Sequence, residues 1–245
     1  MKYKIIQYKY SDLIQDIRSY FNEAKRSIWD RRNKIKIVHY DDTEIAIKSF
    51  KIPHLINKIA YTFLRSSKAE RSYENSLRII DFVPTPIGYV EFKKFALIYD
   101  SYFLSEHYQY DFTIREILTQ NSFPDKENIF KQFALFTYAL HEANVEHLDY
   151  SPGNILIKKI SQEQYEFKVI DINRMKFSTL SKEERLENFS KLWANENDLR
   201  MIIEAYAKIS DMDKDEAIEI ALLASKKHKE NINLKKKLKG KKVVN

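Results

Sequence analysis

The stretch His147-Leu148-Asp149-Tyr150-Ser151-Pro152-Gly153-Asn154 runs directly into the apolar triplet Ile155-Leu156-Ile157. Pro152 and Gly153 mark a loop, and the triplet predicts a buried strand behind it. A short loop that ends in a strand can present the Asp149 carboxylate and the Asn154 amide to one cleft. The segment therefore predicts a functional loop, and its chemistry requires partners elsewhere in the chain.

The spacing of these polar residues, His-x-Asp-x-x-x-x-Asn, resembles the catalytic loop of kinase-like phosphotransferases. In such a loop the Asp carboxylate faces the acceptor hydroxyl, and the Asn carbonyl oxygen faces a magnesium ion bound to the nucleotide phosphates. The resemblance implies three partners: a lysine for the phosphates, a glutamate that holds this lysine, and a second aspartate for magnesium.

A hairpin near the N-terminus offers the lysine. Residues 33–39 and 44–50 flank the turn signal Asp41-Asp42-Thr43, which predicts two antiparallel strands. Lys48 ends the triplet Ala-Ile-Lys, which is the local setting of the nucleotide-pairing lysine in kinases. A solvated strand lysine is the competing interpretation, but the downstream loop makes Lys48 our candidate.

A helix over residues 68–80 offers the glutamate. Glu70 and Glu74 lie one turn apart in it, and Glu74 precedes Leu77 by three residues, so that it borders the apolar face. Glu74 is our candidate for the carboxylate that pairs with Lys48. Glu70 is the alternative partner, and a surface ion pair is the competing interpretation for either residue.

Strands at 88–92, 96–99 and 101–106 are expected to complete the antiparallel sheet of a small N-terminal lobe. The segment 105–107 then connects this lobe to the next, and such a connector holds an adenine ring through backbone groups. Glu106 and His107 are therefore nucleotide-binding candidates. Helical patterns follow at six places: 13–28, 111–119, 127–143, 183–193, 198–209 and 214–225.

The second aspartate stands at the end of a predicted hairpin, 155–159 with 165–170. Asp171 follows this hairpin, 22 residues after Asp149, where a kinase places its principal magnesium ligand. A buried or capping aspartate is the competing interpretation. The four elements then occur in the required order along the chain.

Composition limits the possible partners. The chain has 245 residues, no cysteine and a net charge of +7, and nine lysines with one glutamate lie in residues 226–245. That segment carries +8, so the other residues sum to −1, and no nucleic-acid-binding face is expected. The N-terminus lacks the apolar core of a signal peptide, and no apolar run reaches the roughly 18 residues of a membrane span. We expect a cytoplasmic protein.

The expected domains are an N-terminal lobe (1–106), a C-terminal helical lobe (107–225) and a basic, flexible tail (226–245). The segment 55–65 has an apolar face flanked by basic residues. Together with the tail, it suits peripheral contact with an anionic membrane surface on the inner face of the cytoplasmic membrane. The competing interpretations are a helix packed on its own domain and a solvated tail.

The chain is similar to the lipopolysaccharide kinase family, which phosphorylates Kdo or heptose in the inner core of lipid A. The resemblance implies an α+β, protein-kinase-like bilobal fold. It rests on Ala46-Ile47-Lys48-Ser49-Phe50-Lys51, Lys68-Ala69-Glu70-Arg71-Ser72-Tyr73-Glu74, His147 to Asn154, and Ile170-Asp171.

The same resemblance implies transfer of the γ-phosphoryl group of ATP to a sugar hydroxyl. Asp149 would orient this hydroxyl and accept its proton, Asn154 and Asp171 would hold Mg²⁺, and Lys48, held by Glu74, would neutralise the phosphates. The acceptor would be a lipid A-core glycolipid or another phosphorylated sugar. His147 would brace the loop.

Two departures from the kinase pattern stand out. Gly88 is the first glycine, so the phosphates must be covered by the 41–43 hairpin or by ordinary backbone. Ile172-Asn173 replaces Phe-Gly after Asp171, and asparagine tolerates the left-handed backbone that such a turn needs. These departures keep a pseudokinase that acts as a binding or scaffold module as an alternative.

Further differences from the protein-kinase pattern limit the class of acceptor. Ser151 occupies the place of a phosphate-contacting lysine in many protein kinases, and no Ala-Pro-Glu motif follows Asp171. Little chain remains for a peptide-docking platform, which favours a glycan or small-molecule acceptor. A kinase of proteins or of another small molecule is the third interpretation.

Overall fold

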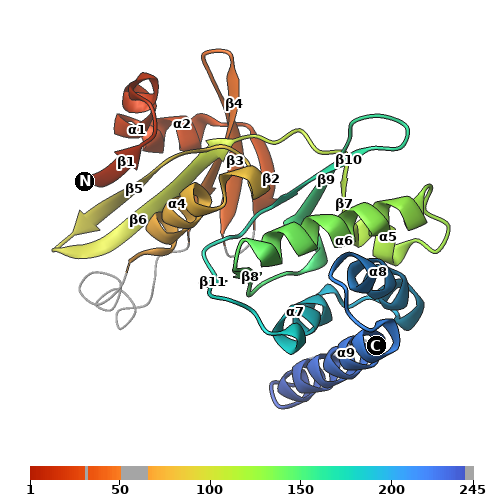
Figure 1. Ribbon diagram of the computed structural model, residues 1–245. Helices are drawn as coiled ribbons and strands as arrows, with labels where there is room; N and C mark the ends of the chain where they lie inside the picture. Colours follow the sequence, from red (N-terminus) through yellow and green to blue (C-terminus); the bar gives the residue numbers. More distant parts are fainter. Residues whose placement is uncertain (31–32, 51–65, 241–245) are drawn as a thin grey trace. The chain divides into compact units, whose positions relative to one another are not determined.

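The computed structural model describes residues 1–30, 33–50 and 66–240 (Figure 1). Its chain divides into two units. Unit 1 comprises Met1–Gln109 with Asp171–Asn173, and unit 2 comprises Tyr110–Ile170 with Arg174–Asn245. The short segment Asp171–Asn173 thus belongs to the unit that is built mainly from the N-terminal part of the chain.

Unit 1 is built on a six-stranded antiparallel sheet with the order β1-β5-β6-β4-β3-β2. The strands are β1 (Lys2–Ile5), β2 (Arg26–Asp30), β3 (Lys34–Tyr40), β4 (Thr43–Ser49), β5 (Pro86–Lys94) and β6 (Leu97–Glu106). The expected hairpin at 33–50 is present as β3 and β4. The segments expected as two strands, 96–99 and 101–106, form the single strand β6.

One face of this sheet is covered by short N-terminal helices: η1 (Tyr8–Tyr10), α1 (Ser11–Gln15) and α2 (Ile17–Glu23). Leu13, Ile14 and Ile17 are fully buried there and pack with side chains of β4, β5 and β6. The helical pattern expected over 13–28 ends at Glu23, because residues 26–30 pair with β3 as an edge strand. Local periodicity does not reveal such a tertiary pairing.

The helix α4 (Lys68–Arg78) covers β5 and β6 on the opposite face, and η3 (Ile80–Phe82) follows it (Figure 1). Its buried side chains Ala69 and Tyr73 pack with Phe50 and Tyr89. The Ser67 hydroxyl caps the helix by accepting the Glu70 N–H at 3.1 Å. The basic helix expected at 55–65 lies outside the described residues.

Unit 2 contains two small antiparallel sheets and a set of helices. One sheet has the order β10-β9-β7 and the other pairs β11 with β8. Its strands are β7 (Phe112–Thr113), β8 (Val145–His147), β9 (Ile155–Lys159), β10 (Tyr165–Val169) and β11 (Met175–Phe177). The helices are α5 (Ile114–Thr119), α6 (Lys126–Glu142), η4 (Pro152–Asn154), α7 (Lys182–Asn188), η5 (Phe189–Leu192), α8 (Glu196–Ile209) and α9 (Lys214–Lys237).

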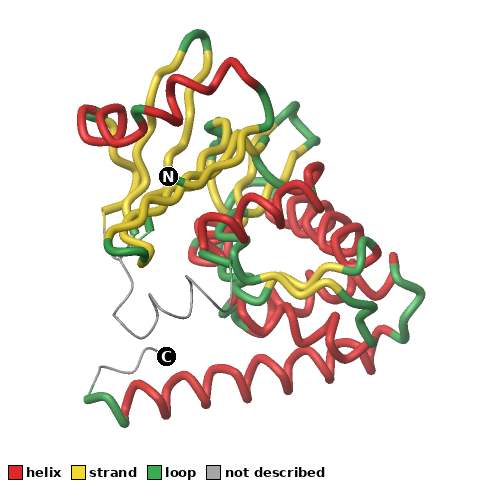
Figure 2. The backbone as a smooth tube through the Cα atoms, turned by 90° about the vertical axis from the view of Figure 1, so that its left-hand side faces the viewer, coloured by secondary structure: helices red, strands yellow, loops and turns green. Residues whose placement is uncertain are grey.

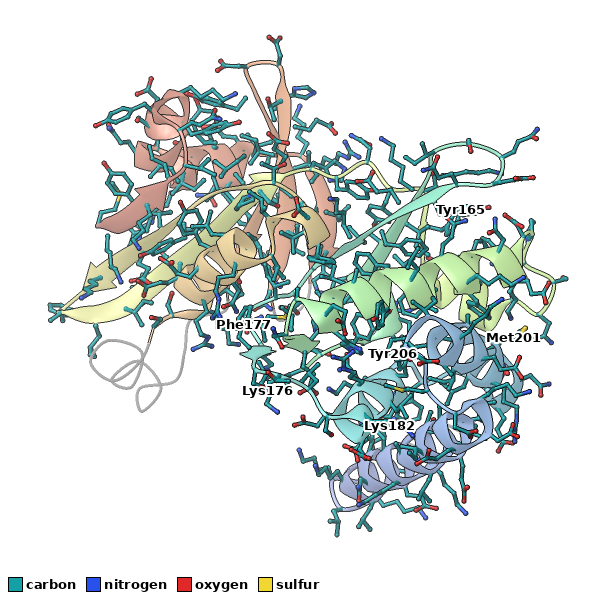
Figure 3. All side chains as sticks on the ribbon, viewed as in Figure 1. Tyr165, Lys176, Phe177, Lys182, Met201 and Tyr206 are labelled. Carbon is teal, nitrogen blue, oxygen red and sulfur yellow. The ribbon has the colours of Figure 1, made fainter. Side chains whose placement is uncertain are left out.

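The core of unit 2 lies where α6 packs against α8, and Tyr206 of α8 projects into it (Figure 3). Phe133 and Phe189 bring their rings together edge to face, with centroids 6.4 Å apart. His141 is fully buried between Tyr206, whose hydroxyl lies 2.8 Å from Nδ1, and Asn188, whose Oδ1 lies 3.3 Å from Nε2. The sequence pattern locates α6 but does not reveal this polar cluster within the core.

The basic segment from residue 226 onward is not a separate flexible tail as far as Lys237. Residues 226–237 are the second half of α9, which Figure 2 shows as one long helix. Lys229 Nζ donates to the Ala194 carbonyl at 2.7 Å, and the Lys236 ammonium lies 5.3 Å from the centre of the Trp193 ring. The prediction failed because contacts of these two lysines with Ala194 and Trp193 hold the segment against residues that precede α8, which the sequence pattern does not reveal. Among the described residues, no helix combines the length and apolar character needed to cross a membrane.

The buried His141 gives unit 2 a pH-dependent stability. Burial lowers the pKa of His141 to about 4, from 6.5, and the charges of Arg185 and Lys191 act in the same direction. The unfolded chain therefore binds a proton that the folded chain excludes, so stability is lost as pH falls below 6.5. Between pH 6.5 and pH 5 the free energy of unfolding should fall by about 2 kcal/mol from this residue.

Urea unfolding at pH 7 and pH 5 tests this prediction. His141→Gln removes the titrating group, so its free energy of unfolding should fall by about 2 kcal/mol less than that of the unmodified chain. An equal pH dependence in both proteins would contradict the assignment.

Candidate active site

The loop between β8 and β9 is held by the fully buried side chain of His147. Its Nδ1 accepts the Asp149 backbone N–H at 3.0 Å, so this nitrogen carries no proton. Its Nε2 therefore carries the proton and donates it to the Ile170 carbonyl at 2.9 Å. The neutral imidazole thus ties the loop to the end of the β9–β10 hairpin, which agrees with the bracing role expected for it.

Asp149 and Asn154 are linked through the backbone of the loop. The Asn154 Nδ2 group donates to the Asp149 carbonyl at 2.9 Å, and this carbonyl also accepts the Ser151 N–H at 2.8 Å. The Asn154 carbonyl accepts the Ile170 N–H at 2.9 Å. Since the amide nitrogen of Asn154 is used inside the loop, its Oδ1 atom remains for a cation. The half-buried Asp149 keeps a solvent-accessible side chain.

Two residues that sequence reasoning missed fix the loop from inside unit 2. Asn188 Nδ2 donates to the His147 carbonyl at 3.0 Å. Tyr150 is fully buried, and its hydroxyl lies 2.8 Å from Thr137 Oγ1. Burial raises the pKa of Tyr150, so this phenol stays neutral. The sequence offered one signal for the burial of Tyr150: an aromatic residue stands between two polar residues, Asp149 and Ser151.

Lys48 lies in a row of side chains that crosses the whole sheet of unit 1. The strand registers place these residues opposite one another: Trp29, Ile35, Lys48, Phe103, Tyr89 and Lys4. The Lys48 side chain is 14% exposed, and its Nζ forms an ion pair with Asp171 Oδ1 at 2.8 Å. Unit 1 therefore brings together two of the expected site residues, Lys48 and Asp171.

The segment Asp171–Asn173 is anchored by α4. Arg71 Nε donates to the Asn173 carbonyl at 3.2 Å, and Asn75 Nδ2 donates to the Ile172 carbonyl at 2.6 Å. Asp171 itself takes the left-handed backbone conformation, with φ of 60°, whereas the sequence had suggested Asn173 for this role. The Asn173 side chain donates to the Asp171 carboxylate instead.

Glu74 does not pair with Lys48 in this structure. Its Oε1 binds Lys4 Nζ at 2.6 Å. The expectation fails because α4 packs over β5 and β6, and the carboxylate reaches outward to β1. Three strand spacings separate Lys4 from Lys48, which is about 14 Å.

Glu70, the alternative partner for Lys48, also binds a lysine of the edge strand β1. Its Oε1 accepts from Lys2 Nζ at 2.6 Å and from the Tyr89 hydroxyl at 2.9 Å. Burial acts to raise the pKa of Glu70, but the bonds from Lys2 and Tyr89 outweigh it, and the pKa is lowered. Both glutamates of α4 are thus bound to β1, a strand that the sequence analysis did not predict.

The connector residues use their backbone N–H groups within unit 1. The Glu106 N–H donates to the Thr85 carbonyl and the His107 N–H to the Glu44 carbonyl, both at 2.8 Å. His107 Nε2 lies 3.3 Å from Arg26 Nη2. Burial, helped by the Arg26 charge, lowers the pKa of His107. An uncharged imidazole at the end of β6 is compatible with a neighbouring adenine ring.

The turn at Asp41-Asp42 lies at the wrong end of β4 to cover phosphates held by Lys48. Thr43 begins β4 and pairs with Tyr40, whereas Lys48 pairs with Ile35 near the start of β3. Five residues of extended strand separate Thr43 from Lys48, which is about 17 Å. The strand ends level with Lys48 are those of β2 and β3.

The comparisons with known proteins now decide the family. The model of the lipopolysaccharide kinase (Kdo/WaaP) family matches residues 67–218, which is more than half of the chain. The chain belongs to this family. A comparison with curated proteins gives no match.

A solved structure supports the fold of this family member. The structure described as WaaP in complex with acyl carrier protein is similar with a TM-score of 0.61 and 12% sequence identity. The similarity covers 94% of this chain and 99% of that chain. The α+β, protein-kinase-like bilobal fold expected from the sequence is therefore confirmed, and family membership identifies the chain as a phosphotransferase of lipopolysaccharide sugars.

The two glutamates of α4 should differ in their effect on stability. Glu74→Gln breaks an ion pair between half-exposed groups and should cost below about 0.5 kcal/mol. Glu70→Gln removes a 14% exposed carboxylate that accepts two bonds, and should cost about 1 kcal/mol or more. Urea unfolding of both variants measures this difference. The KM for ATP is the second measurement, and a larger increase in Glu74→Gln than in Glu70→Gln would contradict the arrangement described here.

Proposed function

We propose that this kinase transfers the γ-phosphoryl group of ATP to a hydroxyl of Kdo or heptose in the lipopolysaccharide inner core. The observation that carries the proposal is the fixed catalytic loop, in which neutral His147 holds the backbone of Asp149. Such positioning is what phosphoryl transfer demands from a protein, because the reaction needs orientation and charge stabilisation more than covalent chemistry.

Asp149 is the proposed catalytic residue. Its backbone is held by His147 on one side and by Asn154 on the other, at 3.0 Å and 2.9 Å. A carboxylate carried by a backbone held in this way can orient the acceptor hydroxyl and take its proton as the hydroxyl oxygen attacks. The surrounding hydrogen bonds restrain the loop, so the backbone that carries the carboxylate does not have to be ordered during the reaction.

Asn154 and Asp171 are the proposed magnesium ligands, and Lys48 is the proposed phosphate ligand. An amide oxygen and a carboxylate fit Mg²⁺, which prefers oxygen donors. When bound, the Mg–ATP complex supplies the phosphoryl group and its charge compensation. The Lys48–Asp171 ion pair supports this proposal, because it brings the two side chains together within unit 1.

The adenine ring is proposed to bind beside Glu106 and His107 through backbone groups other than their own N–H groups, which Thr85 and Glu44 already accept. Ser151 replaces the lysine of many protein kinases, so no cation comes from this position of the loop. Glu74, which pairs with Lys4, has no role in this nucleotide proposal.

Asp149→Asn tests the catalytic assignment. This variant keeps the size of the side chain and removes the base, so kcat for phosphate transfer to Kdo–lipid A should fall by at least about 100-fold. The assay measures labelled phosphate transferred from ATP at saturating Mg²⁺. Thermal shift with millimolar Mg–ATP should stabilise both proteins equally, which separates loss of chemistry from loss of folding.

Two results would contradict this proposal. Full activity of Asp149→Asn would remove the residue from the mechanism. Binding of Kdo–lipid A by the unmodified chain without any phosphate transfer and without stabilisation by Mg–ATP would favour the pseudokinase alternative.

The C-terminal end of α9, together with Leu238 and Lys239 directly after it, is the proposed site of peripheral membrane contact. Leu234 and Leu238 are 57% and 79% exposed, although both are large apolar side chains. They lie one turn apart, with Lys235, Lys237 and Lys239 beside them. Exposed leucines with flanking lysines suit the surface of an anionic bilayer, where a glycolipid acceptor is available.

Vesicle sedimentation tests the membrane proposal. Each lysine near an anionic surface contributes about 1 kcal/mol, so changing Lys235, Lys237 and Lys239 to Gln should weaken binding to phosphatidylglycerol vesicles by about 100-fold at low salt. Replacing three exposed lysines elsewhere in unit 2, Lys131, Lys159 and Lys208, is the matched control. Equal losses in the two triple variants would show that net charge alone, and not α9, determines binding.

A further inference from the structure

The guanidinium group of Arg115 lies directly against Gly153 in the catalytic loop. A Cβ atom built on Gly153 would lie 2.4 Å from Arg115 Nη2 and 2.9 Å from its Cζ. Gly153 stands between Asp149 and Asn154 in the sequence, and η4, to which it belongs, packs against α5. The guanidinium group of Arg115 therefore takes the space that a side chain at position 153 would fill.

The backbone of Arg115 is fixed at the start of α5. The Thr113 side chain accepts the Arg115 N–H at 3.3 Å, and the Glu116 carboxylate accepts the Thr113 N–H at 2.9 Å. Ile114 and Ile117 are fully buried on the other side of the helix. The direction from which Arg115 approaches the loop is thus set by a capping box and by two core contacts.

Within the described part of unit 2, no ion pair compensates the charge of Arg115. The neighbouring Glu116 uses its carboxylate for the Thr113 N–H and hydroxyl. Over residues 1–30, 33–50 and 66–240, no carboxylate forms an ion pair with Arg115. Arg115 itself is exposed. An exposed guanidinium with free donors beside a catalytic loop is suited to bind a phosphate or carboxylate group through two parallel hydrogen bonds.

We propose that Arg115 binds an anionic group of the acceptor sugar and thereby selects acidic or phosphorylated glycans. This inference rests on the proposed function, because it assigns the acceptor side of the same loop. The acceptor is favoured over the nucleotide because Lys48, with a Mg²⁺ ion that Asn154 and Asp171 would hold, would compensate the nucleotide charge. A carboxylate of an acidic sugar and a phosphate ester share the chemistry that Arg115 recognises.

Gly153 contributes to the proposed site because it leaves room for the Arg115 side chain. The side chain that a Cβ would meet is the far end of Arg115, which is flexible, so Gly153→Ala can fold with the guanidinium displaced. In that variant the arginine is retained but no longer rests on the loop. We therefore expect the size of the residue at position 153 to determine the position of the Arg115 guanidinium beside the loop.

The test compares steady-state kinetics of the full chain and of Arg115→Gln, with ATP and Kdo–lipid A varied separately. The KM for Kdo–lipid A should rise at least about tenfold in Arg115→Gln, since a charge-assisted bond is lost, while the KM for ATP stays within twofold. Arg115→Lys should give an intermediate value, because a lysine keeps the charge and loses the fork. Arg200→Gln, which removes another exposed arginine of unit 2, is the matched control and should change neither constant.

A binding measurement without ATP separates this inference from the proposed function. Tryptophan fluorescence titration with Kdo–lipid A should show weaker binding to Arg115→Gln and to Gly153→Ala than to the unmodified chain. Enzymatic removal of the lipid A phosphates tells whether the recognised group is a phosphate, because then the difference between the variants disappears. If the difference persists, the sugar carboxylate is the recognised group.

Three outcomes would overturn the inference. Equal acceptor KM values in Arg115→Gln and the unmodified chain would remove Arg115 from acceptor binding, with the proposed function intact. A rise in the KM for ATP alone would assign Arg115 to the nucleotide. Failure of the unmodified chain to bind Kdo–lipid A would reject both this inference and the proposed acceptor, whereas binding without phosphate transfer, weakened in Arg115→Gln, would reject only the proposed chemistry.

Discussion

The conformation of the catalytic loop depends on the two hydrogen bonds of the buried His147 imidazole. Both of its nitrogens are used inside unit 2, one by the Asp149 backbone and one by the Ile170 carbonyl. A buried, neutral ring has a single tautomer that satisfies both bonds, so the loop has one arrangement. Asn188 and Tyr150 add contacts from the core, and together they leave the Asp149 carboxylate outside this network.

In unit 1 the central interaction is an ion pair, which holds two opposite charges together beside the sheet. Lys48 is matched by Asp171, and the segment that carries Asp171 is bound by Arg71 and Asn75 of α4. The carboxylates of the same helix are neutralised by lysines of β1. One helix thus anchors the segment that carries Asp171 and binds the edge strand β1 through its two glutamates.

The sequence predicted the parts of the fold whose signals are local. The hairpins around Lys48 and after Asn154 have alternating apolar residues and clear turns, and both are present. The edge strands β1 and β2 were missed, since short strands of mixed composition pair only when the rest of the sheet exists. The second half of α9 was missed because a lysine-rich segment gives no apolar periodicity, although the ammonium groups of Lys229 and Lys236 contact Ala194 and Trp193.

By itself, the sequence determined the fold class, the family and the presence of Lys48, Asp149, Asn154 and Asp171 in kinase order, because spacing within one loop or hairpin is a local property. Only the tertiary structure decided which charges meet. Glu74 pairs with Lys4 and Lys48 with Asp171, because strand order and the position of α4 determine these distances. The contact of Arg115 with Gly153 is of the same kind, since it joins residues that no sequence period relates.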